Sequence, residues 1–134
     1  MNSPYVWPAA PAQWPQPLRE EFVAKRGNGR VGSTLVSQTD KVRVWHLTLL
    51  PGERIGFHTH VLDYFWTAMT PGRARSHYGD GDIREVSYAA GDTKHHEYGQ
   101  GEFMIHDLEN IGDTPLVFAT VEFLESANKP LLLD

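Results

Sequence analysis

The chain has 134 residues, of which 40% are hydrophobic and 22% charged, and these values are typical of one globular domain with at most a short appendage. The formal net charge of −5, with histidine neutral, excludes the positive field that non-specific binding to nucleic acid or to anionic membranes requires. The absence of cysteine excludes a disulfide scaffold, a thiol nucleophile and cysteine-ligated metal sites, so any metal must be held by histidine, carboxylate, tyrosine or backbone oxygen.

Residues 1–17 form a proline-rich arm that holds five of the nine prolines. Proline removes a backbone donor and fixes φ, so the arm cannot form a regular helix or a central strand. Trp7 and Trp14 argue against plain disorder, because disordered segments are poor in aromatic residues. We expect an extended arm whose indoles dock on its own barrel or on a partner subunit, followed by a single domain over residues 18–134.

Short apolar or alternating runs, separated by turn signals, fill the rest of the chain. Residues 18–26 have mixed charge and predict one helical turn or a strand. The pattern then predicts strands at residues 34–36, 41–50, 55–60, 64–69, 73–78, 83–88, 103–108 and 116–124. Such strands, at spacings of roughly 8–12 residues, are typical of an all-β sandwich or barrel. We assign no strand to the polar stretch that follows Asp92 and ends at Glu102.

Two of the seven histidines, His58 and His60, flank a single residue within a predicted strand. Residues i and i+2 of a strand point to the same face, so both imidazoles project into one space and can bind one ion. A pair of this kind is expected by chance roughly 0.35 times in a chain of this length and histidine content, so its context decides its weight.

The context of the pair is a spacing of glycine, histidine and asparagine. Gly52, His58-Thr-His60 and Gly72 come first, and Gly91, His106 and Asn110 follow. This spacing resembles the two motifs of the cupin family, of the small single-domain RmlC-like type, over residues 41–124. The resemblance implies a double-stranded β-helix, also called a jelly roll, whose ligands face inward near the wider mouth. It also implies that His58, His60 and His106, the last from a neighbouring strand, bind one divalent transition metal: Fe, Zn, Ni, Mn or Co.

Two departures from the family pattern concern the carboxylate ligand and the second motif. The glutamate of the first motif is missing, since Phe65 or Tyr64 stands at its place and Asp63 lies one residue earlier. The second motif is stretched before His106, and Glu102, which has the strand parity of His106, is a candidate fourth ligand and proton carrier. Three neutral imidazoles suffice for a transition metal with water in the open positions. Loss of the carboxylate favours an anionic substrate bound directly to the ion.

Further candidates concern the lining of the pocket. If Tyr64 and Trp66 face the metal, they line the pocket and Tyr64 acts as acid, base or ligand. If the strand is shifted by one residue, Phe65 and Thr67 face the metal instead. Met104 has the parity of His106 and is predicted to line the barrel, either beside a substrate or by plain core packing.

Charged and histidine side chains outside the motifs give open alternatives. Arg73, Arg75 and His77 share one strand face, which is either the solvent side of a sheet or a cationic wall that binds a substrate carboxylate. His46 is expected at the core or its rim. The adjacent His95 and His96 point to opposite faces, so at least one of them is expected to be exposed.

Two classes of function follow from these features. The first is a small metal-dependent enzyme acting on a small organic acid or dicarbonyl compound by dioxygenase-like, isomerase or lyase chemistry. The second is a ligand-binding or regulatory cupin that uses the same pocket without turnover, and a degenerate cupin without metal is a further alternative. We expect a homodimer, formed by sheet edges or an exchanged arm. No apolar run approaches a membrane span and no secretory signal is present, so the cytoplasm is the expected compartment.

Overall fold

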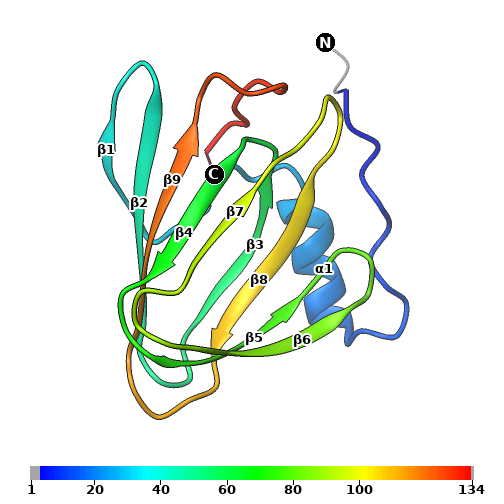
Figure 1. Ribbon diagram of the computed structural model, residues 1–134. Helices are drawn as coiled ribbons and strands as arrows, with labels where there is room; N and C mark the ends of the chain where they lie inside the picture. The colour runs from blue at the N-terminus through cyan, green and yellow to red at the C-terminus, as the bar shows by residue number, and fades with distance from the viewer. Residues whose placement is uncertain (1–3, 134) are drawn as a thin grey trace.

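Two antiparallel β-sheets packed face to face form the body of the protein (Figure 1). The structure is a computed structural model that describes residues 4–133. The five-stranded sheet has the order β1-β2-β9-β4-β7 and the four-stranded sheet the order β3-β8-β5-β6. The all-β class expected from the sequence is confirmed, and neighbouring strands in space come from distant parts of the chain.

The strand boundaries agree closely with the predicted runs. The five-stranded sheet consists of β1 (Thr34–Gln38), β2 (Val42–Leu49), β9 (Leu116–Phe123), β4 (Tyr64–Ala68) and β7 (Thr93–His96). The four-stranded sheet consists of β3 (Arg54–His60), β8 (Met104–Asn110), β5 (Gly72–His77) and β6 (Ile83–Tyr88). β7 lies in the polar stretch for which no strand was predicted, because a short edge strand needs no apolar alternation. His46, expected in the core or at its rim, is exposed on the outer face of β2.

The one helix in the described part of the chain, α1 (Gln16–Lys25), covers the outer face of β3. The sequence predicts either one helical turn or a strand over residues 18–26, and the structure has a helix there. Phe22 packs edge-on against Phe57 with the ring centroids 5.2 Å apart. Glu21 accepts two hydrogen bonds of 2.8 Å from the Arg54 guanidinium. Within residues 4–133, no helix has the length and apolar character needed to cross a bilayer.

The proline-rich arm packs on its own barrel in this chain. Trp14 is only 4% exposed and stacks on Phe57 at 5.5 Å between ring centroids. Trp7 lies edge-on against Phe103 at 4.9 Å. Both indoles therefore pack against the barrel of their own chain, which is one of the two predicted alternatives.

The glycines of the sequence pattern have steric reasons. Gly52 and Gly91 adopt positive φ values of 85° and 92°, a backbone conformation that side chains disfavour. Gly72 begins β5, and a Cβ atom there would lie 2.5 Å from Leu116 Cδ2. Asn110 is buried, and its side-chain amide donates to the carbonyl oxygens of Leu49 and Thr114. The Gly52 amide donates a hydrogen bond of 3.0 Å to the Asn110 carbonyl oxygen, which links the turn before β3 to the end of β8.

The core between the sheets is apolar at one end and contains histidine at the other. The apolar end is formed by the buried residues Leu47, Leu49, Ala68, Ala74, Leu108, Leu116 and Phe118. Toward the other end of β3 and β8, the inward positions are occupied by His58, His60 and His106. The fold therefore places imidazoles where continuation of the pattern would give aliphatic side chains.

Candidate metal centre

Three imidazoles from two adjacent strands converge inside the barrel. His58 and His60 come from β3, and His106 comes from β8, where it lies directly opposite His58 in the antiparallel ladder. One ring nitrogen of each lies within 4.8 Å of the others, the arrangement of a candidate metal site. His58 and His60 are each 3% exposed, and His106 is half-buried. The geometry matches the group of three that the sequence pattern indicated.

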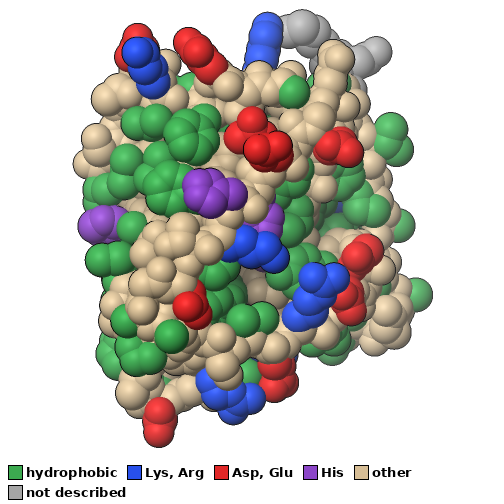
Figure 2. All heavy atoms as spheres, in the orientation of Figure 1, with side chains coloured by type: hydrophobic (Ala, Val, Ile, Leu, Met, Phe, Trp, Pro, Cys, Tyr) green, Lys and Arg blue, Asp and Glu red, His purple; other side chains and the backbone are tan. Residues whose placement is uncertain are grey.

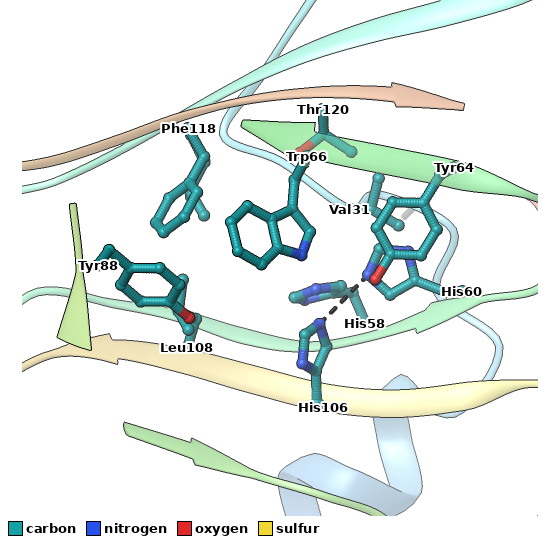
Figure 3. A pocket seen from close by; sticks show the side chains of 11 residues that line it. Val31, His58, His60, Tyr64, Trp66, Tyr88, His106, Leu108, Phe118 and Thr120 are labelled. Atoms are coloured by element: carbon teal, nitrogen blue, oxygen red, sulfur yellow. Dashed lines mark hydrogen bonds between the residues drawn. The ribbon is translucent and has the colours of Figure 1, made fainter. Parts of the chain in front are cut away.

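The shortest of these distances fits a shared ion. His60 Nε2 and His106 Nε2 lie 3.2 Å apart (Figure 3). Zn–N bonds of about 2.0–2.1 Å place two ligand nitrogens about 3.3 Å apart in a tetrahedral site and about 3.0 Å apart in an octahedral one. The separation lies between these values, so the nitrogens of His60 and His106 have the spacing of two ligands of one divalent transition metal.

The protonation of the histidines also suits metal binding. Burial lowers the pKa of His58 to about 4, and burial places the pKa values of His60 and His106 well below the ordinary value. His58 Nδ1 lies 2.9 Å from the Gly56 carbonyl oxygen, which leaves Nε2 as the free ligand atom. The Nδ1 atoms of His60 and His106 are buried without a hydrogen-bond partner. All three rings are therefore neutral near pH 7, as metal ligation requires.

Neither carboxylate proposed as a fourth ligand belongs to this cluster. Asp63 Oδ1 accepts a hydrogen bond of 2.9 Å from the Tyr98 amide. Glu102, which is exposed, accepts a hydrogen bond from the Gly99 amide. Both carboxylates hold the loop after β7, and the cluster found among residues 4–133 consists of histidine alone.

The register of β4 places Tyr64 and Trp66 inside the barrel, which is one of the two predicted alternatives. Tyr64 stacks on His60 with ring centroids 4.1 Å apart and an interplanar angle of 11°. The ring of His96, from β7, also stacks on the ring of Tyr64, with centroids 4.8 Å apart and an interplanar angle of 6°. Phe65 faces outward beside the exposed His95. Burial raises the pKa of Tyr64 well above its ordinary value, so its hydroxyl stays protonated.

A small cavity, here called the inner cavity, adjoins the three imidazoles. Its volume is about 60 Å³, and it is lined by Val31, Leu47, His58, His60, Tyr64, Trp66, Tyr88, His106, Leu108, Phe118 and Thr120 (Figure 3). Apolar and aromatic side chains thus surround the histidines and limit the access of water. The space is sufficient for a very small ligand or for one end of a larger one.

A wider cavity, here called the vestibule, leads outward from His106. Its volume is about 390 Å³, and it is lined by Tyr64, Trp66, Ser76, Tyr78, Arg84, Val86, Ser87, Tyr88, Asp92, Thr93, Lys94, His96, Met104, His106 and Leu108. Figure 2 shows Lys and Arg side chains beside a hollow in this face, with hydrophobic side chains deeper in it. Met104 and Trp66, two of the predicted lining residues, lie on its wall.

The arginines predicted as a possible cationic wall lie elsewhere. Arg73 and Arg75 are on the outer face of β5, where both pair with Glu85, at 3.2 Å and 2.9 Å. His77, on the same face, bonds the buried carboxylate of Asp107 at 2.9 Å. The solvent-side alternative therefore describes Arg73 and Arg75, and the structure does not bring them to either cavity. The basic side chains at the vestibule are Arg84 on β6 and Lys94 on β7. Sequence reasoning missed them because they meet only when the two sheets fold together, and because β7 was not predicted.

Sequence reasoning also missed Glu122, a buried carboxylate on the inner face of β9. It is 3% exposed and accepts a hydrogen bond of 2.7 Å from Trp45 Nε1. In the sheet it lies between Arg43 on β2 and Tyr64 on β4. Burial raises the pKa of Glu122 to about 7. Its position in an alternating strand was visible in the sequence, but the face it occupies was not.

Comparison with known proteins relates the chain to one superfamily. No protein-family model matches it. It is 30% identical to oxalate decarboxylase of Bacillus subtilis over 112 aligned residues, which cover 79% of this chain and 26% of that protein. The chain therefore spans about a quarter of the length of this curated relative, with 26% covered.

Solved structures share the fold. A cupin domain from Bordetella pertussis matches with a TM-score of 0.59 and 26% identity, over 67% of this chain and 88% of that one. A protein with a double-stranded β-helix domain from Klebsiella pneumoniae matches with a TM-score of 0.56 and 26% identity, over 75% and 83% of the two chains. The two facing sheets are thus the double-stranded β-helix that the sequence pattern implied.

Proposed function

The chain belongs to the cupin superfamily, and we propose that it is a mononuclear metal-dependent enzyme acting on a small organic acid or dicarbonyl compound. His58, His60 and His106 hold one divalent transition metal, with Fe, Zn, Ni, Mn and Co as the candidates. The observation that carries the proposal is the convergence of three neutral imidazoles beside the inner cavity.

The chemistry of the donor set supports an anionic substrate. When bound, the metal supplies a Lewis acid that polarises a carboxylate or enolate oxygen. The three ligands are neutral, so the charge of a dication is not offset by the protein and attracts an anion strongly. The apolar walls of the inner cavity exclude water and strengthen that attraction.

Tyr64 is the proposed proton donor of the site. It lines both cavities and lies against His60, within the space that a substrate on the histidine cluster would share. Its raised pKa keeps the hydroxyl protonated, so it can donate a hydrogen bond and does not act as a base. Glu102, the other predicted catalytic residue, lies on a loop with its carboxylate engaged by Gly99, and nothing in the geometry supports a catalytic role for it.

Lyase chemistry is the favoured reaction class. The curated relative is named for the decarboxylation of oxalate, and that reaction removes a carboxyl group from a small acid. Oxygen-dependent cleavage of a dicarbonyl compound uses the same donor set and is the second candidate. A ligand-binding protein without turnover is the alternative to an enzyme. The observation in its favour is that the cluster found within residues 4–133 consists of three histidines and includes no carboxylate.

The test is a substrate screen on the purified protein loaded separately with Mn(II), Fe(II) and Co(II). Release of CO₂ and consumption of O₂ are measured across small mono- and dicarboxylic acids and 1,3-diketones. We expect turnover with at least one acid, and loss of that turnover in His106→Ala. If every metal-loaded form binds an acid tightly but neither releases CO₂ nor consumes O₂, the protein is a ligand-binding cupin and not an enzyme.

The homodimer and the cytoplasmic location remain predictions. The arm packs on its own barrel, so arm exchange no longer supports the dimer, and contacts between sheet edges remain as its basis. Light scattering at micromolar concentration tests it: a dimeric mass is expected, and a monomeric mass would contradict it.

A further inference from the structure

We propose that Arg84 and Lys94 form an anion-binding subsite at the vestibule, separate from the histidine cluster, and that the substrate is an organic acid with a second anionic group. The inference rests on the proposed function for the position of the first anionic group. It adds the class of substrate, a dianion whose two charged ends are joined by a short apolar segment. Both side chains lie outside the cupin motifs.

Both cations point inward from the edge strands that flank the opening between the sheets. β7 is the last strand of one sheet and β6 the last strand of the other. Lys94 lies opposite Trp66, whose side chain is inside the barrel, and Arg84 lies opposite the buried Ser76. Opposite residues of an antiparallel pair share a face, so both cations face the vestibule that they line.

Arg84 is held in place with its binding edge free. Its guanidinium carbon lies 5.0 Å from the centroid of the Tyr78 ring. Its Nε donates to Asp82 at 2.6 Å, and within residues 4–133 its two Nη groups have no protein acceptor. A guanidinium fixed in this way presents two parallel donors, the geometry that matches a carboxylate.

Tyr78 connects this cation to the metal site. The Tyr78 ring lies 5.4 Å from the His106 ring, centroid to centroid. The guanidinium carbon of Arg84 lies 5.0 Å from the centroid of the Tyr78 ring. Its distance to the centroid of the His106 ring therefore cannot exceed the sum of 5.0 Å and 5.4 Å. A small extended acid can reach from the histidine cluster to Arg84.

Of the acidic side chains nearby, one pairs with Arg84 and leaves its two Nη groups available, and the other bonds the backbone. Asp82 is engaged by Arg84 Nε, and Asp92 accepts a hydrogen bond of 2.8 Å from the Ala89 amide. His96, beside Lys94 on the same strand, adds no negative charge. The vestibule thus has two cationic side chains on opposite walls. Asp82 offsets part of the charge of Arg84 but occupies only its Nε, and the Nη groups of Arg84 and the ammonium group of Lys94 remain as donors for an anion.

Between the two anion positions the wall is apolar. Trp66, Tyr88 and Leu108 line both cavities, and Met104 adds a flexible apolar side chain at the vestibule. Such a wall favours methylene or aromatic carbon between the charged ends of the substrate. Inward-pointing charges on edge strands also occur as a defence against edge-to-edge aggregation, and the experiment separates this role from binding.

The test measures binding of glutarate and of pentanoate, which have the same chain length but two anionic groups and one, to protein loaded with Co(II). Isothermal titration gives the dissociation constants, and the visible spectrum of Co(II) gives metal occupancy independently. Arg84→Gln and Lys94→Gln are compared with Arg75→Gln, a matched loss of charge on the outer face of β5. Sedimentation of each variant measures aggregation.

We expect glutarate to bind wild type more tightly than pentanoate, and each vestibule variant to weaken glutarate about tenfold. Pentanoate binding, Co(II) occupancy and the behaviour of Arg75→Gln are expected to stay within about twofold of wild type. Equal glutarate affinity in wild type and both vestibule variants, with Co(II) bound, overturns this inference and leaves the proposed metal site standing. Aggregation of the variants without a loss of glutarate affinity also overturns it. Failure of wild type to bind Co(II) overturns the proposed function itself.

Discussion

His60 Nε2 and His106 Nε2 lie 3.2 Å apart, although 46 residues separate them in the chain. The approach is set by the ladder between β3 and β8, in which His106 faces His58 and Met104 faces His60. A shift of this register by one residue would turn the imidazoles of one strand out of the barrel. The metal site is thus a direct consequence of strand pairing.

The ring of Tyr64 is expected to position His60, whose Nδ1 has no hydrogen-bond partner. Tyr64→Leu removes the stacked ring and is predicted to raise the dissociation constant of the metal about tenfold, a typical effect of losing a group that orients a ligand. Tyr64→Phe keeps the ring and is predicted to change it less than about threefold. Competition with a chromophoric chelator measures both, with the outward-facing Phe65→Leu as control. Equal metal affinity in the Leu and Phe variants would contradict the positioning role.

Glu122 is predicted to make stability depend on pH. Burial raises its pKa from 4.5 to about 7 in the folded protein, although the Trp45 hydrogen bond and the charge of Arg43 oppose the shift. The folded state therefore binds the proton more tightly than the unfolded state. This contribution to stability is complete below pH 4.5, declines as the pH rises, and is lost above the folded pKa of about 7.

The measurement compares urea unfolding of wild type and Glu122→Gln from pH 4.5 to 8. Since Gln does not titrate, we expect the stability of wild type relative to the variant to fall by up to about 3 kcal/mol across this window. A difference that is constant with pH, or that grows in favour of wild type as the pH rises, would show that the carboxylate is not held protonated.

Asp107 is predicted to stabilise the outer face of the four-stranded sheet, the face that α1 covers. It is fully buried and accepts hydrogen bonds from Arg54 Nε at 2.8 Å and from the His77 ring at 2.9 Å. Asp107→Asn removes the charge but keeps the shape, and the partly buried Arg54 loses half of its compensation. We expect a loss of about 3 kcal/mol in the free energy of unfolding. Glu85→Gln, which breaks exposed ion pairs on the neighbouring strand, is expected to cost about 1 kcal/mol or less. Similar small losses in the free energy of unfolding of both variants would contradict this role of Asp107.

Trp14 is predicted to hold the proline-rich arm on the barrel. Its indole is buried between Phe57 and Phe22, with ring centroids at 5.5 Å and 5.6 Å. Trp14→Ala should lower the free energy of unfolding by about 3 kcal/mol and speed tryptic cleavage at Arg19. Val6→Ala alters an arm residue that is 88% exposed and should change neither quantity. Unchanged cleavage in Trp14→Ala would mean that the arm is held by other contacts.

Most of the fold followed from sequence because its signals are local. Alternation and turn residues gave strands such as Ile83–Tyr88 at their observed limits. The register of β4 was not accessible, since Tyr64 and Phe65 are both aromatic and either can face a core. β7 was missed because Thr93–His96 is a short, polar edge strand whose pairing with β4 is a tertiary property.

The site was predictable where spacing alone determines geometry. The pair His58-Thr-His60 on one strand had to share a face, and His106 was placed by the resemblance. The carboxylates could not be placed, because Asp63 and Glu102 bond loop amides that no sequence pattern identifies. Arg84 and Lys94 meet at one opening only through the folding of two sheets, so neither was singled out.

The most direct test of the account is the metal content of the purified protein and of two variants, His58→Ala and His106→Ala. Plasma mass spectrometry after growth in metal-supplemented medium gives the ions bound per chain, and circular dichroism verifies that each variant is folded. We predict about one transition-metal ion per chain in wild type and less than about a tenth of that in each folded variant. Metal content that is undiminished in both variants, or absent from wild type even after reconstitution, would contradict the three-histidine centre.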